Sequence, residues 1–135
     1  EHFVLIWTGH FKPNMPLIRL GRALSEKMGV YFLSNTDPLH IPPLFDKFPQ
    51  VMFYHGLALS WELGALKPDR RYYRLAMDKL DLDPAECLFL DDRPENVAAA
   101  EEFGLRAIQH RNNSETRALL QAALDGQGLN LDSLA

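Results

Sequence analysis

Short apolar runs alternate with amphipathic helical segments along the 135 residues of this chain. The runs are rich in β-branched and aromatic residues and too short for helices, which is typical of strands buried on both faces of a sheet. They predict strands at 30–33, 51–54, 87–90 and 106–109. Apolar spacing with start and stop residues predicts helices at 15–28, 67–80, 94–103 and 114–124, the last with Ser114 as N-cap. This alternation predicts an α/β fold, a Rossmann-like three-layer sandwich with a mostly parallel sheet.

The composition narrows the class of protein. With 47% apolar and 24% charged residues, the chain is expected to form one soluble globular domain. Its one cysteine, Cys87, excludes an intramolecular disulfide and a zinc site built on several thiolates, so we expect a cytoplasmic protein. A net charge of -4 without a block of Lys and Arg argues against nucleic acid as a partner. The apolar runs fall far short of the roughly 20 residues of a membrane helix, so no membrane partner is expected either.

Polar residues follow the predicted strands at the edge where such sheets bind ligands. Ser34 follows the first predicted strand, Asp91 and Asp92 follow the third, and Lys67 opens the helix between the second and third. Ligands of open parallel sheets bind at the carboxyl ends of the strands. A hydroxyl, an ammonium and two carboxylates there suit a phosphoryl group together with a cation such as Mg²⁺.

Each of these residues also has a purely structural explanation. Ser34 lies in ordinary turn sequence, and Lys67 could be a side chain exposed to solvent. The acidic pair could cap the helix that starts near Pro94. Taken singly, Ser34 and Lys67 are better explained by structure. Asp91 and Asp92 favour function, because adjacent carboxylates after a buried strand repel each other unless a cation or a lysine offsets them.

Three segments in this order resemble the second, third and fourth motifs of the haloacid-dehalogenase-like (HAD) hydrolases. They are Val-Tyr-Phe-Leu-Ser-Asn-Thr at 30–36 with His40 following, Gly-Ala-Leu-Lys-Pro-Asp at 64–69, and Cys-Leu-Phe-Leu-Asp-Asp-Arg-Pro-Glu-Asn-Val at 87–97. The chain is similar in particular to the phosphatase branch with the glucose-1-phosphate phosphatases and the phosphatase domain of soluble epoxide hydrolases. Receiver domains use similar residues, but their acidic pair comes first in the chain, and here it comes last.

The resemblance implies a phosphate site made from the second and third motifs. Ser34 would bind a phosphoryl oxygen, and Asn35 would help to hold the substrate or the loop. Lys67 would lie against the nucleophilic carboxylate and the phosphoryl group, and His40 could face the substrate pocket. Ser34 and Lys67 are therefore the candidate catalytic residues, for a substrate that is a small phosphorylated metabolite.

The resemblance also implies a magnesium site at the fourth motif. Asp92 would be a Mg²⁺ ligand, Asp91 a neighbour tied to the metal waters or to Lys67, and Asn96 a supporting partner. The reaction implied is Mg²⁺-dependent hydrolysis of a phosphomonoester through an aspartyl-phosphate. Dehalogenation is the same attack on carbon without a metal, and the acidic pair favours the phosphatase.

The first motif of the family, Asp-x-Asp after the opening strand, is absent from this sequence. We interpret residues 1–12 as a remnant of the helical cap or linker, 13–125 as the HAD-like core and 126–135 as a tail. The first strand and most of the cap would then be missing, and the chain as given would be inactive for lack of the nucleophile. Asp37 is the nearest substitute, but Asp-Pro is ordinary turn sequence.

A missing central strand would leave two apolar strands without a hydrogen-bonding neighbour. Two strands could close up, a homo-oligomer or another partner could supply a strand, or the sequence could omit residues that the protein has. We favour the last, because the motifs are intact and mutually consistent. Two other functions stay open: a nucleophile-free HAD-like binding or regulatory protein, and a haloacid dehalogenase.

Overall fold

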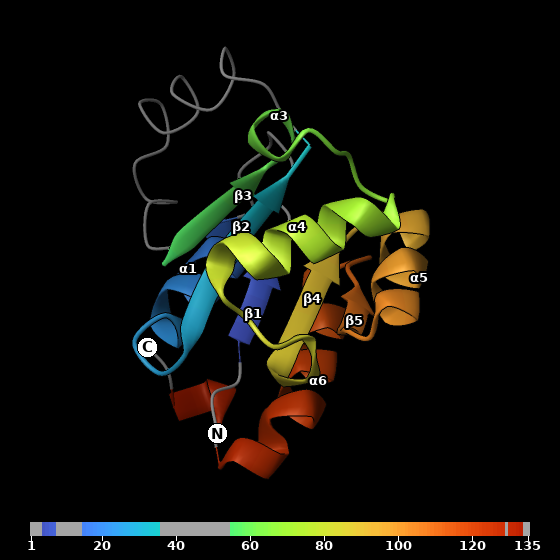
Figure 1. The fold of residues 1–135 in the computed structure, drawn as a ribbon. Helices are drawn as coiled ribbons and strands as arrows, with labels where there is room; N and C mark the ends of the chain where they lie inside the picture. Colours follow the sequence, from blue (N-terminus) through green and yellow to red (C-terminus); the bar gives the residue numbers. More distant parts are fainter. Residues whose placement is uncertain (1–3, 8–14, 36–54, 129, 134–135) are drawn as a thin grey trace.

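Five strands form one sheet in the order β3-β2-β1-β4-β5, and all of their pairings are parallel (Figure 1). The computed structural model of the chain describes residues 4–7, 15–35, 55–128 and 130–133. The strands are β1 Val4–Trp7, β2 Gly29–Ser34, β3 Gly56–Leu59, β4 Cys87–Asp91 and β5 Arg106–Gln109. The predicted class, a parallel α/β sheet, is thus confirmed.

Helices cover both faces of the sheet and give it three layers (Figure 1). They are α1 Met15–Leu24, α3 Ser60–Leu63, α4 Arg70–Leu80, α5 Pro94–Phe103 and α6 Asn113–Leu124. Alternate residues of β4 point to opposite faces, as the two-residue period of a strand requires. Leu88 and Leu90 pack with α1 and α6, whereas Cys87 and Phe89 pack with α4 and α5. Every residue of β4 is buried, which explains its continuous apolar pattern.

The centre of the sheet holds β1, and this corrects the expected role of the first residues. Val4 pairs with Gly29 of β2 on one side and with Cys87 of β4 on the other. Residues 4–7 are therefore a strand and not a cap remnant, and the strands that carry Ser34 and Asp91 do not lack a neighbour. The reason is hydrogen bonding, since the amides and carbonyls of two buried strands need a partner and the apolar run at 4–7 provides it.

The structure has a strand, β3, directly after the position of the second predicted strand. The chain pairs with β2 at Gly56–Leu59, whereas 51–54 lies outside the described residues. Gly56 permits close packing here, because a Cβ on this residue would lie 2.9 Å from a methyl carbon of Leu80 and 3.0 Å from the ring of Tyr31. The β3 strand therefore sits close under α4.

Three helix boundaries also differ from the expectation. The helix predicted at 67–80 begins at Arg70, because Asp69 is its N-cap and accepts from the Arg71 amide. The first helix ends at Leu24 and not at residue 28, because its last turn tightens and the amides of Lys27 and Met28 both donate to the Leu24 carbonyl. The last helix is capped by Asn112 and not by Ser114, since the Asn112 side chain accepts a hydrogen bond from the Glu115 amide.

Leu131 packs on the face of the sheet that α6 covers. Leu131 is buried in the same cluster as Leu120 and Leu124, and its amide donates to Gln121 Oε1 over 2.8 Å. Over the described ranges, no helix has the length and the apolar character needed to cross a membrane.

Candidate functional site

The predicted site residues gather at the carboxyl ends of β2 and β4, on either side of β1. Ser34 is the last residue of β2 and is buried, and Asn35 follows it. Asp91 is the last residue of β4, and Asp92 follows it. The parallel register brings these ends to one edge of the sheet, which is where ligands of such sheets bind.

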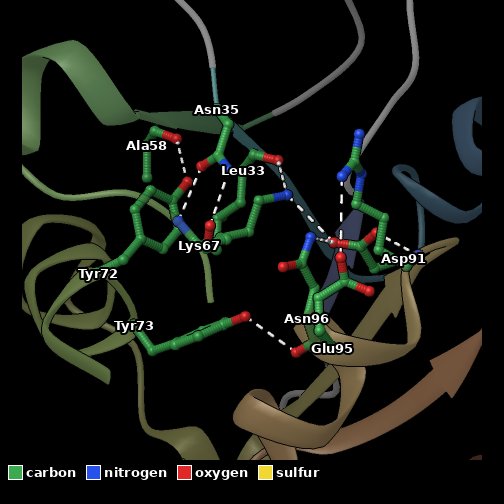
Figure 2. A network of polar contacts seen from close by, with 10 residues as sticks. Leu33, Asn35, Ala58, Lys67, Tyr72, Tyr73, Asp91, Glu95 and Asn96 are labelled. Atoms are coloured by element: carbon green, nitrogen blue, oxygen red, sulfur yellow. Dashed lines mark hydrogen bonds and ion pairs between the residues drawn. The ribbon is translucent and has the colours of Figure 1, made fainter. Parts of the chain in front are cut away.

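Lys67 reaches this edge from the segment between α3 and α4. Gly64 ends α3 in the left-handed conformation at φ 71°, and Asp69 caps α4 by accepting from the Arg71 amide. The Lys67 ammonium lies 3.2 Å from Asp91 Oδ2 and 3.3 Å from the Leu33 carbonyl oxygen (Figure 2). The Phe89 ring centroid lies 5.9 Å from the same Nζ. The lysine is thus a buried cation with two oxygen partners and not a solvated side chain.

Asp91 is held by three donors. Its Oδ2 accepts from Lys67 Nζ and, over 2.9 Å, from Asn96 Nδ2, and its Oδ1 accepts from the Arg93 amide over 3.0 Å (Figure 2). Asn96 is fixed in turn because it lies in the first turn of α5, where the Tyr73 hydroxyl donates to its carbonyl over 2.9 Å. The Asp91 carboxylate therefore has a fixed position under the sheet edge.

Burial and the opposite charge of the partner have opposing effects on the pKa of each residue in this pair. Burial lowers the pKa of the Lys67 ammonium, and the Asp91 carboxylate offsets only part of that effect. Burial alone would raise the pKa of Asp91, but the Lys67 ammonium and the hydrogen bonds from Arg93 and Asn96 outweigh it and hold this pKa below its usual range. Asp91 is therefore a stable carboxylate at neutral pH.

Asn35 binds the backbone of Lys67. Its Oδ1 accepts from the Lys67 amide over 2.9 Å, and its Nδ2 donates to the Lys67 carbonyl over 3.0 Å (Figure 2). Both polar atoms of the carboxamide are thus directed at one residue. This contact joins the end of β2 to the segment before α4.

Asp92 lies at the same edge, partly buried, and its carbonyl accepts from Gln109 Nε2 over 3.5 Å. His40, the predicted pocket residue, and Asp37 lie outside the described residues. The structure therefore brings together Ser34, Asn35, Lys67, Asp91, Asp92 and Asn96, and it links four of them by hydrogen bonds: Asn35, Lys67, Asp91 and Asn96.

Three contributors to the site could not be recognised from the sequence. The Leu33 carbonyl and the Arg93 amide are backbone groups, and any residue type there would offer them. Tyr73 was expected only as part of a helix, and nothing in its spacing distinguishes the hydroxyl that binds Asn96 from an ordinary core tyrosine.

The site offers few carboxylates that could coordinate Mg²⁺. The described parts of the chain contain no group of three His, Cys, Asp or Glu side chains that could hold a metal ion. Asp91 already accepts three hydrogen bonds, so Asp92 is the carboxylate better suited to coordinate a cation. Mg²⁺ is often held by one or two carboxylates with water and substrate phosphate completing its shell, and this donor set agrees with that type of site.

Comparison with known proteins gives the same family as the motifs. A family model described as haloacid dehalogenase-like hydrolase matches residues 14–104. The D-ribitol-5-phosphate phosphatase of Bacteroides thetaiotaomicron is 28% identical over 127 residues, which cover 88% of this chain and 61% of that protein. The chain spans about half the length of the curated relatives it matches.

Two solved structures share the fold. An uncharacterized protein from Corynebacterium glutamicum superposes with a TM-score of 0.72 at 25% identity, over 96% of each chain. A HAD family enzyme from Bacteroides thetaiotaomicron, solved in complex with magnesium and inorganic phosphate, gives a TM-score of 0.65 at 28% identity, over 73% of this chain and 53% of that one. The predicted resemblance is thereby confirmed.

Proposed function

The chain belongs to the haloacid dehalogenase-like hydrolases, and on that basis we propose that it forms the phosphate-binding part of a Mg²⁺-dependent phosphomonoester hydrolase. The observation that carries this proposal is the buried pair of Lys67 and Asp91 at the carboxyl edge of the sheet. A fixed ammonium at the same sheet edge as Ser34, whose side chain carries a hydroxyl, is suited to the charge of a phosphoryl group. The substrate is a small phosphorylated metabolite. The name of the related D-ribitol-5-phosphate phosphatase, whose substrate belongs to this class, supports this part of the proposal.

Mg²⁺ would be held by Asp92. When bound, the ion neutralises phosphate charge and fixes its orientation. A related enzyme solved in complex with magnesium and inorganic phosphate supports the use of Mg²⁺, and the choice of Asp92 is part of our proposal. Asp91 would keep Lys67 in place, and Asn96 would keep Asp91 in place.

The nucleophile is the part of the reaction that this sequence does not supply. The first aspartate of the chain is Asp37, and the residues directly after β1 are Thr8 and Gly9. An aspartyl-phosphate would therefore need an aspartate from elsewhere than the end of β1. The chain by itself should bind phosphate without hydrolysing it.

The test is release of phosphate from an aryl phosphate by the protein purified at its native length. We expect turnover with Mg²⁺, loss of turnover with EDTA, and a loss of about a hundredfold or more in Lys67→Ala, because an electrostatic group at the reacting phosphate is removed. Turnover that is indifferent to EDTA would contradict the proposal.

A second function is favoured by the position of β1. This strand occupies the centre of the sheet without an aspartate after it, so a protein that only binds Mg²⁺ and a phosphorylated ligand would have the same structure. Phosphate binding without turnover at native length would support this second function. Release of halide from a 2-haloacid without metal would instead indicate a dehalogenase.

A further inference from the structure

The geometry points to Asn35 as a positioning residue that holds Lys67 in place, and not as a group that binds the phosphate itself. The carboxamide forms a two-bond clasp on the Lys67 backbone, with Oδ1 2.9 Å from the amide nitrogen and Nδ2 3.0 Å from the carbonyl oxygen. This inference depends on the proposed function only in treating Lys67 as the phosphate-facing cation.

The end of β2 holds Lys67 at two points. The Asn35 side chain binds the lysine backbone, and the Leu33 carbonyl accepts from its ammonium over 3.3 Å (Figure 2). A lysine side chain has a flexible four-carbon stem, so a fixed ammonium position requires that the backbone be fixed as well. The clasp fixes that backbone relative to the strand that also carries Ser34.

Asn35 anchors the backbone of the segment around Lys67, whereas Ala65 and the Lys67 ammonium anchor it through their side chains. Lys67 is buried, whereas its neighbours Leu66, Pro68 and Asp69 are exposed. The hydrogen bond from the Asp69 amide to the Leu66 carbonyl is local to the turn and does not attach it to the sheet. The Asn35 clasp, between residues 32 positions apart, does attach it.

The clasp and a phosphate-binding role compete for the same atoms. The side-chain amide of Asn35 donates to the Lys67 carbonyl, and turning the carboxamide toward a phosphate would break that bond. A buried carbonyl that loses its donor costs free energy, so the arrangement favours the clasp.

The test measures how well Lys67 is protected from an amine-reactive reagent, by peptide mass spectrometry on the folded protein without substrate. In Asn35→Ala we expect labelling of Lys67 to rise about tenfold, because lost hydrogen bonds make local opening more frequent. The exposed Lys79, 38% exposed, is the internal reference and should not change. In Asn35→Asp the labelling should also rise, since a carboxylate oxygen would face the Lys67 carbonyl.

The matched control is Gln121→Ala. This change also removes a carboxamide with two hydrogen bonds, to the Leu131 amide and to Asp125, but near the end of α6. Labelling of Lys67 should stay at the wild-type level there, which separates a local effect from a general loss of stability.

A direct phosphate-binding role of Asn35 predicts a different labelling result. If Asn35 binds phosphate directly, both Asn35 variants will leave Lys67 as protected as in the wild type and will lose only the binding of inorganic phosphate in the presence of Mg²⁺. That outcome would overturn the inference. The labelling needs no turnover. Its outcome can therefore be interpreted even if the phosphatase assay shows no activity.

Discussion

Lys67 and Asp91 form an ion pair with Nζ 3.2 Å from Oδ2, and their side chains are only 5% and 2% exposed. The pair joins the segment before α4 to the last residue of β4. Burying two charges is costly, and the cost is offset only when both are paired and hydrogen-bonded, as they are here by the Leu33 carbonyl, the Arg93 amide and Asn96. The position of each charge therefore depends on the other.

Removal of one charge should destabilise the protein strongly. In Lys67→Met the Asp91 carboxylate stays buried without its cation, and we expect the free energy of unfolding to fall by about 3 kcal/mol. Urea unfolding at neutral pH measures this. The double variant Lys67→Met with Asp91→Asn should recover part of the loss, because no buried charge remains.

The matched control for that experiment is Lys79→Met. Lys79 forms an ion pair of similar length, 3.1 Å, with Glu62, but both side chains are more than a third exposed. Its loss should change the free energy of unfolding by less than about 1 kcal/mol. Equal effects of the two lysine changes would show that burial of the Lys67 pair has no energetic importance.

The stability of the protein should depend on pH through Asp91. Its pKa is lower in the folded protein than the usual value of about 3.9 in an unfolded chain. The folded state therefore binds fewer protons near this value, so the stabilisation is present above about pH 4 and is lost as the pH falls through the folded pKa. Urea unfolding between about pH 3 and 6 in EDTA should show a steeper acid decline for the wild type than for Asp91→Asn. Parallel profiles would mean that Asp91 is not the group responsible.

Much of the fold was predictable because most elements are marked locally. The strand at 87–91 is a buried apolar run that ends in carboxylates, and Pro94 and Gly104 mark the two ends of α5. The strand at 4–7 was not predicted as such, since four apolar residues do not distinguish a strand from the end of a helix by periodicity. Only its pairing with β2 and β4 decides its structure.

The site was predictable as a set of residues but not as a network. The order of Ser34, Lys67 and Asp91 along the chain was enough to place them at one sheet edge. The contact of Asn35 with the Lys67 backbone was not, because it depends on how the loop between α3 and α4 crosses the end of β2. Sequence identifies residue types, whereas such backbone contacts depend on loop geometry.

At neutral pH, Asn96→Asp should lower the free energy of unfolding more than Asn96→Ala does. Asn96→Ala removes a hydrogen bond to a buried charge, worth about 2 kcal/mol. Asn96→Asp places a second carboxylate about where the donor stood, so at neutral pH it should cost more than the alanine change. Like charges at this distance raise a pKa, so the difference should shrink at about pH 4. Unfolding of both variants at the two pH values checks this, and a smaller cost for Asn96→Asp at neutral pH would contradict it.

Close packing at β3 should make Gly56→Ala destabilising. The added Cβ would lie 2.9 Å from a methyl carbon of Leu80 and 3.0 Å from the ring of Tyr31, so these side chains must move, at a cost of about 1–3 kcal/mol. Gly126→Ala is the matched control, since nothing lies within 4 Å of a Cβ there. Thermal unfolding should show a lower Tm for the first variant and little change for the second. A Tm for Gly56→Ala equal to that of the wild type would mean that β3 and α4 are not packed this closely.

Loss of the carboxylate at Asp92 should remove the effect of Mg²⁺ on stability. A ligand that binds only the folded state raises the free energy of unfolding by about 2.7 kcal/mol at a hundred times its dissociation constant. Mg²⁺ with inorganic phosphate should therefore raise the Tm of the wild type, and Asp92→Asn should show no such rise. Glu95→Gln, an exposed residue in the first turn of α5, removes the same charge nearby and should keep the full rise. If Glu95→Gln lost the rise as well, the effect would come from the overall negative charge of this edge and not from coordination by Asp92.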